Sequence, residues 1–329
     1  SSPGNAATKS KFDSNANIEN KNVATLASEM HKGEEIGTNR LRMMDMLTEL
    51  YGEEYAQKYI EQLDSHIIYR HDETHPLFPY CVSVTLYPFI CHGLKSIGGP
   101  SDAPKHLSSF AGTFVNLVFA ISAQFAGAVA TPEFLSYLDY YIRLEYGDDY
   151  YLHVDDIANS RSNRPRTIGK EITDIFEQVT HSLNEPAAAR NYQSVFWNIA
   201  YFDKPYFEAL FEDFVFPDGT EMQWESVSWL QKYFMQWFNK ERTRTYLTFP
   251  VETVNLVYDP NTKEYLDQDW YDFTAEMWAK GHSFFCYTSD TVDSLSSCCR
   301  LKNGITENTF SYTLGAGGIA TGSKAVVTM

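Results

Sequence analysis

The 329-residue sequence is poor in basic residues, in cysteines and in long apolar runs, and each shortage excludes a class of protein. Its 26 lysines and arginines stand against 43 aspartates and glutamates, which gives a formal net charge of −17. So acidic a chain is not expected to bind the phosphates of DNA or RNA over an extended surface. Small nucleotides stay compatible with it, because a local positive pocket or a helix N-terminus is enough to hold them.

No apolar run approaches the roughly 20 residues that a membrane-spanning helix needs, and no basic stretch followed by an apolar one opens the chain. We therefore expect a cytoplasmic protein without a membrane partner. The five cysteines form neither an even set nor a C-x-x-C unit. A disulfide framework and a tetrahedral zinc site are both poorly supported, so we expect reduced thiols and no metal within this chain.

The chain divides into two predicted parts. It begins with SSPGNAATKS, without methionine, and ends with SKAVVTM inside a predicted strand, so we expect a segment of a longer chain. Residues 1–75 are predicted to hold a polar linking segment, with helix beginning around Ala24, and then two helices separated by a break at Gly52. Residues 76–329 form the second part.

In the second part, predicted strands alternate with predicted helices. The strands are expected at 80–89, 193–202, 245–259, 282–289 and 324–329, and the helices at 106–127, from Pro132 onward, and at 164–183, 205–213, 223–242 and 268–280. This alternation is typical of an α/β fold with largely parallel strands and helical crossovers. The pattern alone does not separate an open doubly wound sheet from a barrel or half of one.

A long segment, 289–322, follows the fourth predicted strand and has no convincing apolar period. Segments of this length in compact domains are usually functional or disordered. This one contains the adjacent thiols of Cys298 and Cys299, followed by Arg300. The thiols are interpreted either as two small hydrophobes in a loop or as groups for covalent, metal or radical chemistry, with Arg300 favouring an anionic partner or a thiolate.

Two other features are candidates for a site. The run GAGGIATGS, 315–323, suits phosphate binding through consecutive backbone N–H groups. It lacks the lysine of a P-loop, so a turn-rich return to the last strand is the alternative. Cys81 lies in the first predicted strand and by period two shares a face with Ser83 and Thr85. Such a small, polar face suits a barrel interior or a site, and a buried inert thiol is the alternative.

Several stretches, taken together in their order and spacing, resemble the anaerobic ribonucleotide reductases, the glycyl-radical class that reduces ribonucleoside triphosphates. The stretches are FDSNANIENKN, HDETHPLFPYC, SIGGPSDAPKHLSSFAGTFVNLVFAISAQFAGAVATPEFLSYLDYY, TFPVETVNLVYD, SSCCRL and TLGAGGIATGSKAVVTM, and they run along nearly the whole chain. The resemblance implies an α/β fold that is the first half of a ten-stranded α/β barrel. In that fold a central finger loop, 289–322, carries the radical cysteine, and N-terminal helices precede the barrel.

The resemblance also implies the catalytic residues. In the family the radical cysteine directly precedes an arginine, which maps it to Cys299, and the cysteine on the first barrel strand maps to Cys81. A glycyl radical takes a hydrogen atom from Cys299, and the thiyl radical removes the 3′ hydrogen of the substrate ribose. The 2′ hydroxyl leaves as water, and Cys81 supplies a reducing hydrogen. Cys298, Ser297 and Arg300 neighbour the radical site, and Cys298 is expected to tune or protect it.

Nucleotide contacts are implied at two places. We expect Gly317, Gly318 and Ser323 to contact the substrate. The family reads a deoxynucleotide effector at its dimer interface, and in the corresponding region of this chain Asp102 and Lys105 are the candidates for effector contact. The expected ligands are therefore a ribonucleoside triphosphate substrate, ATP or dATP, and dNTP effectors, and the expected assembly is a homodimer or larger.

Other implied components lie outside this chain. They are the glycyl radical, the iron–sulfur and S-adenosylmethionine activase that installs it, a C-terminal zinc site and an N-terminal ATP-binding domain. Formate-using members typically carry methionine two places before the radical cysteine, where this chain has Ser297. We interpret this departure as indicating the subgroup that uses a thioredoxin-like or glutaredoxin-like reductant.

Two other functions compete with the reductase interpretation. A glycyl-radical acyltransferase of the pyruvate formate-lyase type also uses adjacent cysteines, but it would need both thiols and would not need Cys81. A non-catalytic nucleotide-sensing module would bind nucleotide through the Gly-rich run and residues 102–125. In such a module the thiols would only pack.

Overall fold

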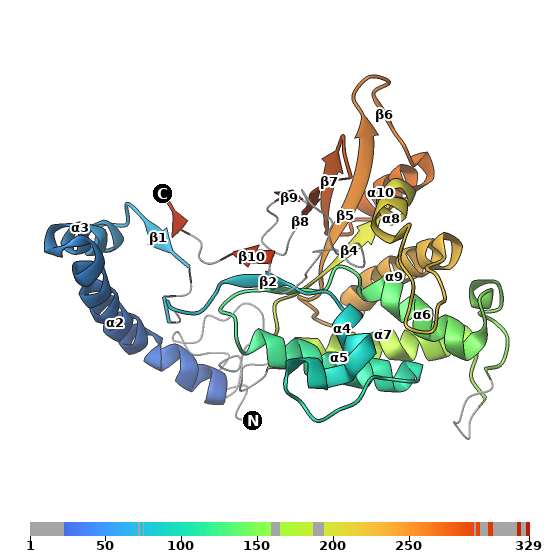
Figure 1. Ribbon diagram of the computed structural model, residues 1–329, viewed down its shortest axis with the longest axis horizontal. Helices are drawn as coiled ribbons and strands as arrows, with labels where there is room; N and C mark the ends of the chain where they lie inside the picture. The colour runs from blue at the N-terminus through green and yellow to red at the C-terminus, as the bar shows by residue number, and fades with distance from the viewer. Residues whose placement is uncertain are drawn as a thin grey trace.

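The computed structural model describes residues 23–71, 73–74, 76–158, 165–186, 194–292, 294–296, 302–304, 321–323 and 327–329. Two N-terminal helices, α2 (Val23–Tyr51) and α3 (Glu53–Asp64), stand at one side of a larger α/β unit (Figure 1). They meet at Gly52, whose φ of 89° is a conformation that glycine adopts at little cost. The predicted pair of helices with a break at Gly52 is therefore confirmed.

Five parallel strands form the core of the main sheet. They are β2 (Cys81–Ser83), β3 (Val129–Ala130), β4 (Trp197–Phe202), β5 (Val251–Asp259) and β7 (Phe285–Ser289), paired in sequence order. The short strand β6 (Glu264–Tyr265) returns antiparallel along the end of β5.

The strand order decides between the two architectures that the sequence pattern left open. A doubly wound sheet reverses its strand order and carries helices on both faces, whereas a barrel keeps sequence order and carries its helices outside. Here the order is sequential, and Figure 1 shows the crossover helices gathered on the lower and right-hand side of the curled sheet. The fold is a parallel half-barrel, as predicted.

The helices that cover the sheet begin where the sequence supplies caps. The side chains of Thr167, Asp203 and Asp267 accept hydrogen bonds from backbone N–H groups three residues ahead, at 3.0–3.2 Å. Such caps satisfy donors that a helix N-terminus leaves unpaired. The helical elements of this region are α4 (Tyr87–His92), η1 (Gly93–Ile97), α5 (Leu107–Ser122), α6 (Phe134–Tyr146), η2 (Tyr150–Leu152), α7 (Ile168–Asn184), α8 (Lys204–Phe211), α9 (Trp224–Arg244) and α10 (Gln268–Ala279). Among these described helices and α2 and α3, none is long and apolar enough to cross a membrane.

The hydrophobic core lies between the sheet and these helices. Trp197 on β4 is fully buried, and its ring centroid lies 5.8 Å from that of Phe114 on α5 and 5.2 Å from that of Phe134 on α6. Its indole Nε1 donates a 2.8 Å hydrogen bond to Thr131 Oγ1. The polar atom of this fully buried indole is therefore satisfied while the ring joins two helices to the sheet.

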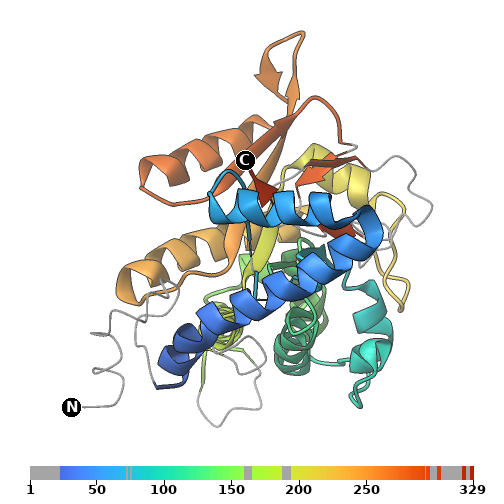
Figure 2. The same ribbon diagram turned by 90° about the vertical axis from the view of Figure 1, so that its left-hand side faces the viewer.

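Helix α2 is tied to the loop that leads into β2. The Arg40 guanidinium donates to both carboxylate oxygens of Glu73, at 3.0 and 2.9 Å, and the Asn39 amide donates to the carbonyls of Glu73 and Thr74. Figure 2 shows α2 and α3 folded back on each other in front of the sheet. A bidentate arginine–carboxylate pair fixes both the distance and the orientation of its partners. Helix α2 therefore fixes the position of the loop that leads into β2, the strand of Cys81.

Two expectations for the strands are wrong in detail, and one strand was missed. The strand predicted at 80–89 ends at Ser83, and α4 begins at Tyr87 because Pro88 suits a first helical turn. Strand β3 was not predicted, since only two of its residues pair. The fifth strand, predicted at 324–329, is described only from Val327 on, and that part does not join the main sheet. Instead β11 (Val327–Thr328) pairs antiparallel with β1 (Tyr69–Arg70).

The carboxyl end of β4 generates a prediction about pH. Asp203 follows β4, caps α8 and accepts a 2.7 Å bond from the Val257 N–H. Burial raises the pKa of Asp203 from 3.8 to about 6, although bonds from Val257 and Tyr206 oppose the shift. A raised carboxyl pKa stabilises the fold below the unfolded-state pKa, and that contribution is lost as pH rises through the folded-state value.

We therefore expect the free energy of unfolding of the wild type to fall relative to that of Asp203→Asn between pH 4 and pH 7. The asparagine stays neutral and mimics the protonated carboxyl. A pKa difference of about 2 corresponds to a relative change of about 3 kcal/mol. Urea denaturation at several pH values measures it, and a difference that does not vary with pH would contradict the placement of Asp203.

Candidate active site

The inner face of the half-barrel carries the candidate site. Side chains alternate along each strand, so Val82, Val129 and Trp197 enter the helix-side core, whereas Cys81, Ala128 and Ala130 form a separate small cluster. The predicted shared face of Cys81 and Ser83 is confirmed. Thr85 lies beyond the strand and donates a 3.2 Å bond to Glu133, so its place on that face is corrected.

Cys81 is held in a closed setting. Cys81 is only 3% exposed, and the backbone N–H of Ala128 donates a hydrogen bond to the Cys81 Sγ atom at 3.2 Å. A backbone donor at this distance orients the sulfur and stabilises electron density on it. The other two described cysteines, Cys91 and Cys286, are half-buried. Burial raises the pKa of Cys286 to about 11 and also raises that of Cys91, so both stay protonated at neutral pH.

Gly127 makes room for this thiol. A Cβ added at Gly127 would lie 2.8 Å from Cys81 Sγ and 2.8 Å from the carbonyl oxygen of Tyr80. The Gly127 N–H donates to that same carbonyl at 2.6 Å. The close approach of two backbones beside the thiol therefore requires a residue without a side chain.

The Gly-rich run returns to Cys81 from the far end of the chain. Its last residues form β10 (Thr321–Ser323), which pairs antiparallel with β2 so that Ser323 stands opposite Cys81 and Thr321 opposite Ser83. The predicted substrate residue Ser323 thus lies on the strand beside the thiol. Gly317 and Gly318 lie outside the described residues.

Two short strands that flank the adjacent cysteines pair with each other. Strand β8 (Ser294–Ser296) pairs antiparallel with β9 (Lys302–Gly304), with Ser296 opposite Lys302. Within its described residues, the predicted loop 289–322 therefore contains strands β8 and β9 and the start of β10. The candidates Ser297, Cys298, Cys299 and Arg300 lie between β8 and β9, outside the described residues.

The predicted effector residues lie on the surface before α5. Asp102 is exposed and pairs with Lys95, whose hydrogen bond holds the pKa of Asp102 below its usual value. Lys105 is exposed as well. The first N–H of α5, that of Leu107, donates to Glu145 Oε2 at 3.3 Å. A carboxylate of this chain therefore already lies at the N-terminus of α5.

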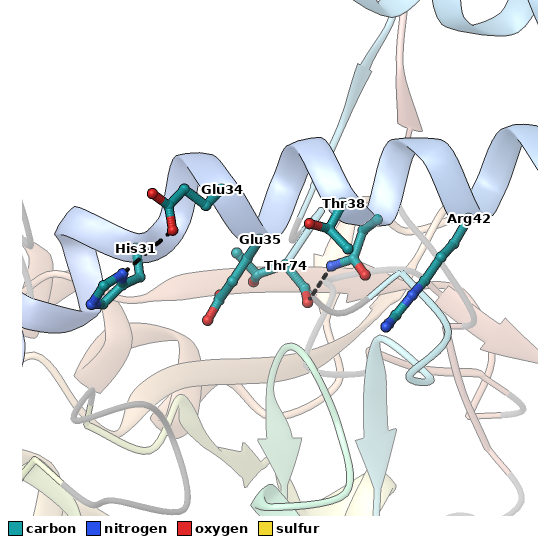
Figure 3. A pocket seen from close by; sticks show the side chains of 7 residues that line it. His31, Glu34, Glu35, Thr38, Arg42 and Thr74 are labelled. Atoms are coloured by element: carbon teal, nitrogen blue, oxygen red, sulfur yellow. Dashed lines mark hydrogen bonds and ion pairs between the residues drawn. The ribbon is translucent and has the colours of Figure 1, made fainter.

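Two other features lie away from Cys81. A surface groove of about 540 Å³ runs along α2, where Glu35, Thr38 and Arg42 project from one side of the helix (Figure 3). The side chains of Glu177, His181 and Glu241 bring potential metal-ligand atoms within 4.8 Å of one another.

Glu177, His181 and Glu241 belong to an ion-pair network that links α7 and α9. Arg244 donates to Glu241 Oε2 at 3.1 Å, and the Glu241 Oε1 atom lies 3.1 Å from His181 Nε2. Because the guanidinium already neutralises Glu241, we do not assign a metal to this group.

The contact between Gly127 and Cys81 generates a second prediction. Gly127→Ala should lower the free energy of unfolding by about 1–3 kcal/mol through overpacking. The loss should shrink when Cys81 is also changed to Ala, because the sulfur contact is then absent. Urea denaturation of the two single variants and the double variant measures this coupling.

The matched control for Gly127→Ala is Gly112→Ala, inside α5. There an added Cβ would find its nearest neighbour at 4.0 Å. Alanine in a helix interior is favoured over glycine by about 0.5–1 kcal/mol, so this variant should be neutral or more stable. Equal losses for Gly127→Ala with and without the Cys81 thiol would show that the two do not touch.

Comparison with known proteins matches the chain to one family. Residues 28–329 match the family model for anaerobic ribonucleoside-triphosphate reductase. No curated protein sequence matches the chain.

Solved structures of anaerobic ribonucleotide reductase from Thermotoga maritima share the fold. The structure in complex with dATP and CTP is 30% identical with a TM-score of 0.71, and the match covers 84% of this chain and 45% of that one. The structure with dATP bound in the specificity site is 30% identical with a TM-score of 0.70, over 83% of this chain and 44% of that one. The chain thus spans less than half the length of these two relatives. It belongs to the anaerobic ribonucleoside-triphosphate reductase family, a family of oxidoreductases.

Proposed function

We propose that the enzyme to which this chain belongs reduces ribonucleoside triphosphates to deoxyribonucleoside triphosphates, without oxygen, by thiyl-radical chemistry. The observation that carries the proposal is the buried thiol of Cys81 on the inner face of the half-barrel, with the end of the Gly-rich run paired beside it. Family membership supports the same chemistry and favours it over acyl transfer and over nucleotide sensing alone.

In this proposal two thiols act on the substrate in turn. Cys299 would give its hydrogen atom to a glycyl radical outside this chain, and the thiyl radical left on Cys299 would remove the 3′ hydrogen of the ribose. The 2′ hydroxyl then leaves as water, and Cys81 gives a hydrogen atom to the substrate. The product is then a 3′-ketone with a thiyl radical left on Cys81, and a thiol of the external reductant bonds to that radical and passes one electron, with a proton, to the ketone. The 3′ hydrogen finally returns from Cys299, which regenerates the Cys299 thiyl radical.

The electron balance requires an external reductant. Replacing the 2′ hydroxyl by hydrogen consumes two electrons and two protons and releases one water. Cys81 supplies one reducing equivalent as a hydrogen atom, and the reductant supplies the second to the substrate through the sulfur–sulfur bond it forms with Cys81. A second thiol of the reductant then breaks that bond, which restores the Cys81 thiol and leaves the reductant as a disulfide. We propose a thioredoxin-like or glutaredoxin-like dithiol protein in this role, because Ser297 stands where formate-using members typically carry methionine.

The setting of Cys81 suits a radical reaction. A closed site excludes water and competing reactions, and the residue is almost fully buried with a backbone N–H aimed at its sulfur. We propose that Gly317, Gly318 and Ser323 contact the substrate and that Asp102 and Lys105 contact a dNTP effector in a cytoplasmic homodimer or larger assembly. A radical-SAM activase would install the glycyl radical, with the zinc site and the ATP-binding domain outside this chain.

The pair of adjacent cysteines provides a test. Strictly anaerobic turnover of a ribonucleoside triphosphate by the radical-activated enzyme should disappear in Cys299→Ser, because a hydroxyl O–H bond is too strong to replace the S–H bond. Cys298→Ser should retain roughly half or more of the wild-type rate, since it removes only a neighbour. Deoxynucleotide formation by Cys299→Ser would sink the assignment, and loss of activity only in Cys298→Ser would move the radical by one residue.

A further inference from the structure

Two buried polar atoms on the inner face of the half-barrel have no hydrogen-bond partner among the residues that the structure describes. They are Nδ2 of Asn198 on β4 and Oγ1 of Thr253 on β5. The two residues are only 2% and 1% exposed. A buried donor or hydroxyl without a partner costs the fold stability, because the group has left water and gained nothing in return. Such atoms within the described part of the chain need an explanation.

The strand register places both residues on the face of Cys81. Ser83 pairs with Ala130, and Ala130 pairs with Asn198, so these three side chains share a row across β2, β3 and β4. Ala200 pairs with Thr253 one row farther along the strands. With strands ~4.8 Å apart and a rise of ~3.3 Å per residue, Asn198 lies about 12 Å from Cys81, and Thr253 about 8 Å beyond Asn198.

Small side chains lie in the rows between these residues. Ala128 and Ala130 separate Cys81 and Ser83 from β4, and Ala200 stands beside Thr253. Of the buried polar side-chain atoms without a partner among the described residues, these two are the ones that lie on strands of the main sheet. A neighbouring polar side chain of β5 does find a partner. The Asn255 amide donates to the Tyr201 carbonyl at 3.2 Å, for example. The unsatisfied pair is thus confined to one line that runs from the thiol toward the carboxyl ends of the strands.

We infer that Asn198 and Thr253 are substrate-binding residues of this enzyme. The Asn198 amide nitrogen can only donate, so it requires an acceptor oxygen, and the Thr253 hydroxyl can donate or accept. A ribonucleotide offers such oxygens on its ribose, its base and its phosphates, and its ribose must lie at Cys81 for the proposed reaction. The inference therefore rests on the proposed function and adds two contacts to it.

The test exploits the missing partners. Thr253→Val and Asn198→Leu remove polar atoms that have no partner in the described part of the chain, so the melting temperature should hold or rise. The dissociation constant of a ribonucleoside triphosphate should rise about three- to tenfold in each variant, as expected for one lost hydrogen bond. Equilibrium dialysis with the complete enzyme before radical activation measures it.

The matched control is Thr274→Val in α10. Thr274 is also 1% exposed, but its hydroxyl donates to the Trp270 carbonyl at 2.7 Å. Its loss should lower the melting temperature and leave nucleotide affinity unchanged, the opposite of the result for Thr253→Val. Inorganic triphosphate serves as a second ligand. Weaker binding of both ligands places the contact at the phosphates, and weaker binding of the nucleotide alone places it at the ribose or base.

Wild-type affinity in Thr253→Val and Asn198→Leu, or a loss of stability like that of the control, would overturn the inference. Turnover by the activated wild-type enzyme is measured in parallel. It shows whether the two proposed contacts or the proposed reaction is wrong. Reduction by the wild type with unchanged binding in both variants rejects only the two contacts. Binding without reduction by the wild type rejects the proposed reaction.

Discussion

The alternation of side chains across five parallel strands in sequence order is the constraint on which the rest of the structure depends. It sends Trp197 and its neighbours toward the helices, where aromatic packing forms the core, and leaves Cys81, Ala130 and Asn198 on the other face. A slip of one residue in this register would exchange the two faces. Fold stability and the chemistry of the inner face are therefore set by the same pairing.

The second constraint is the close approach at Gly127. It lets two backbones meet beside a sulfur atom, and it places the Ala128 N–H against that sulfur. On the other side of β2, strand β10 brings residues from the end of the chain to the same thiol. Cys81 is thus enclosed by segments distant in sequence, which suits a group that acts only on a bound substrate.

Local sequence signals were enough to predict most helices and one face of β2. The strands that were missed form only by pairing with residues far away in the sequence. The break at Gly52, the major helices and the face shared by Cys81 and Ser83 follow from periodicity and residue type. Strands β3 and β10 exist only through their neighbours, because two or three residues carry no period of their own. Asn198 and Thr253 were not predicted, although a polar residue inside the apolar run FWNIAYF was a usable signal.

The most direct test of the central claim uses Cys81→Ser and a ribonucleoside triphosphate that carries deuterium at C3′. If Cys299 begins the reaction and Cys81 only reduces, the activated variant should still remove deuterium from C3′. That deuterium should exchange into solvent through the thiol, while no deoxynucleotide forms. Deoxynucleotide formation at the wild-type rate, or complete retention of deuterium, would contradict the division of roles between the two thiols.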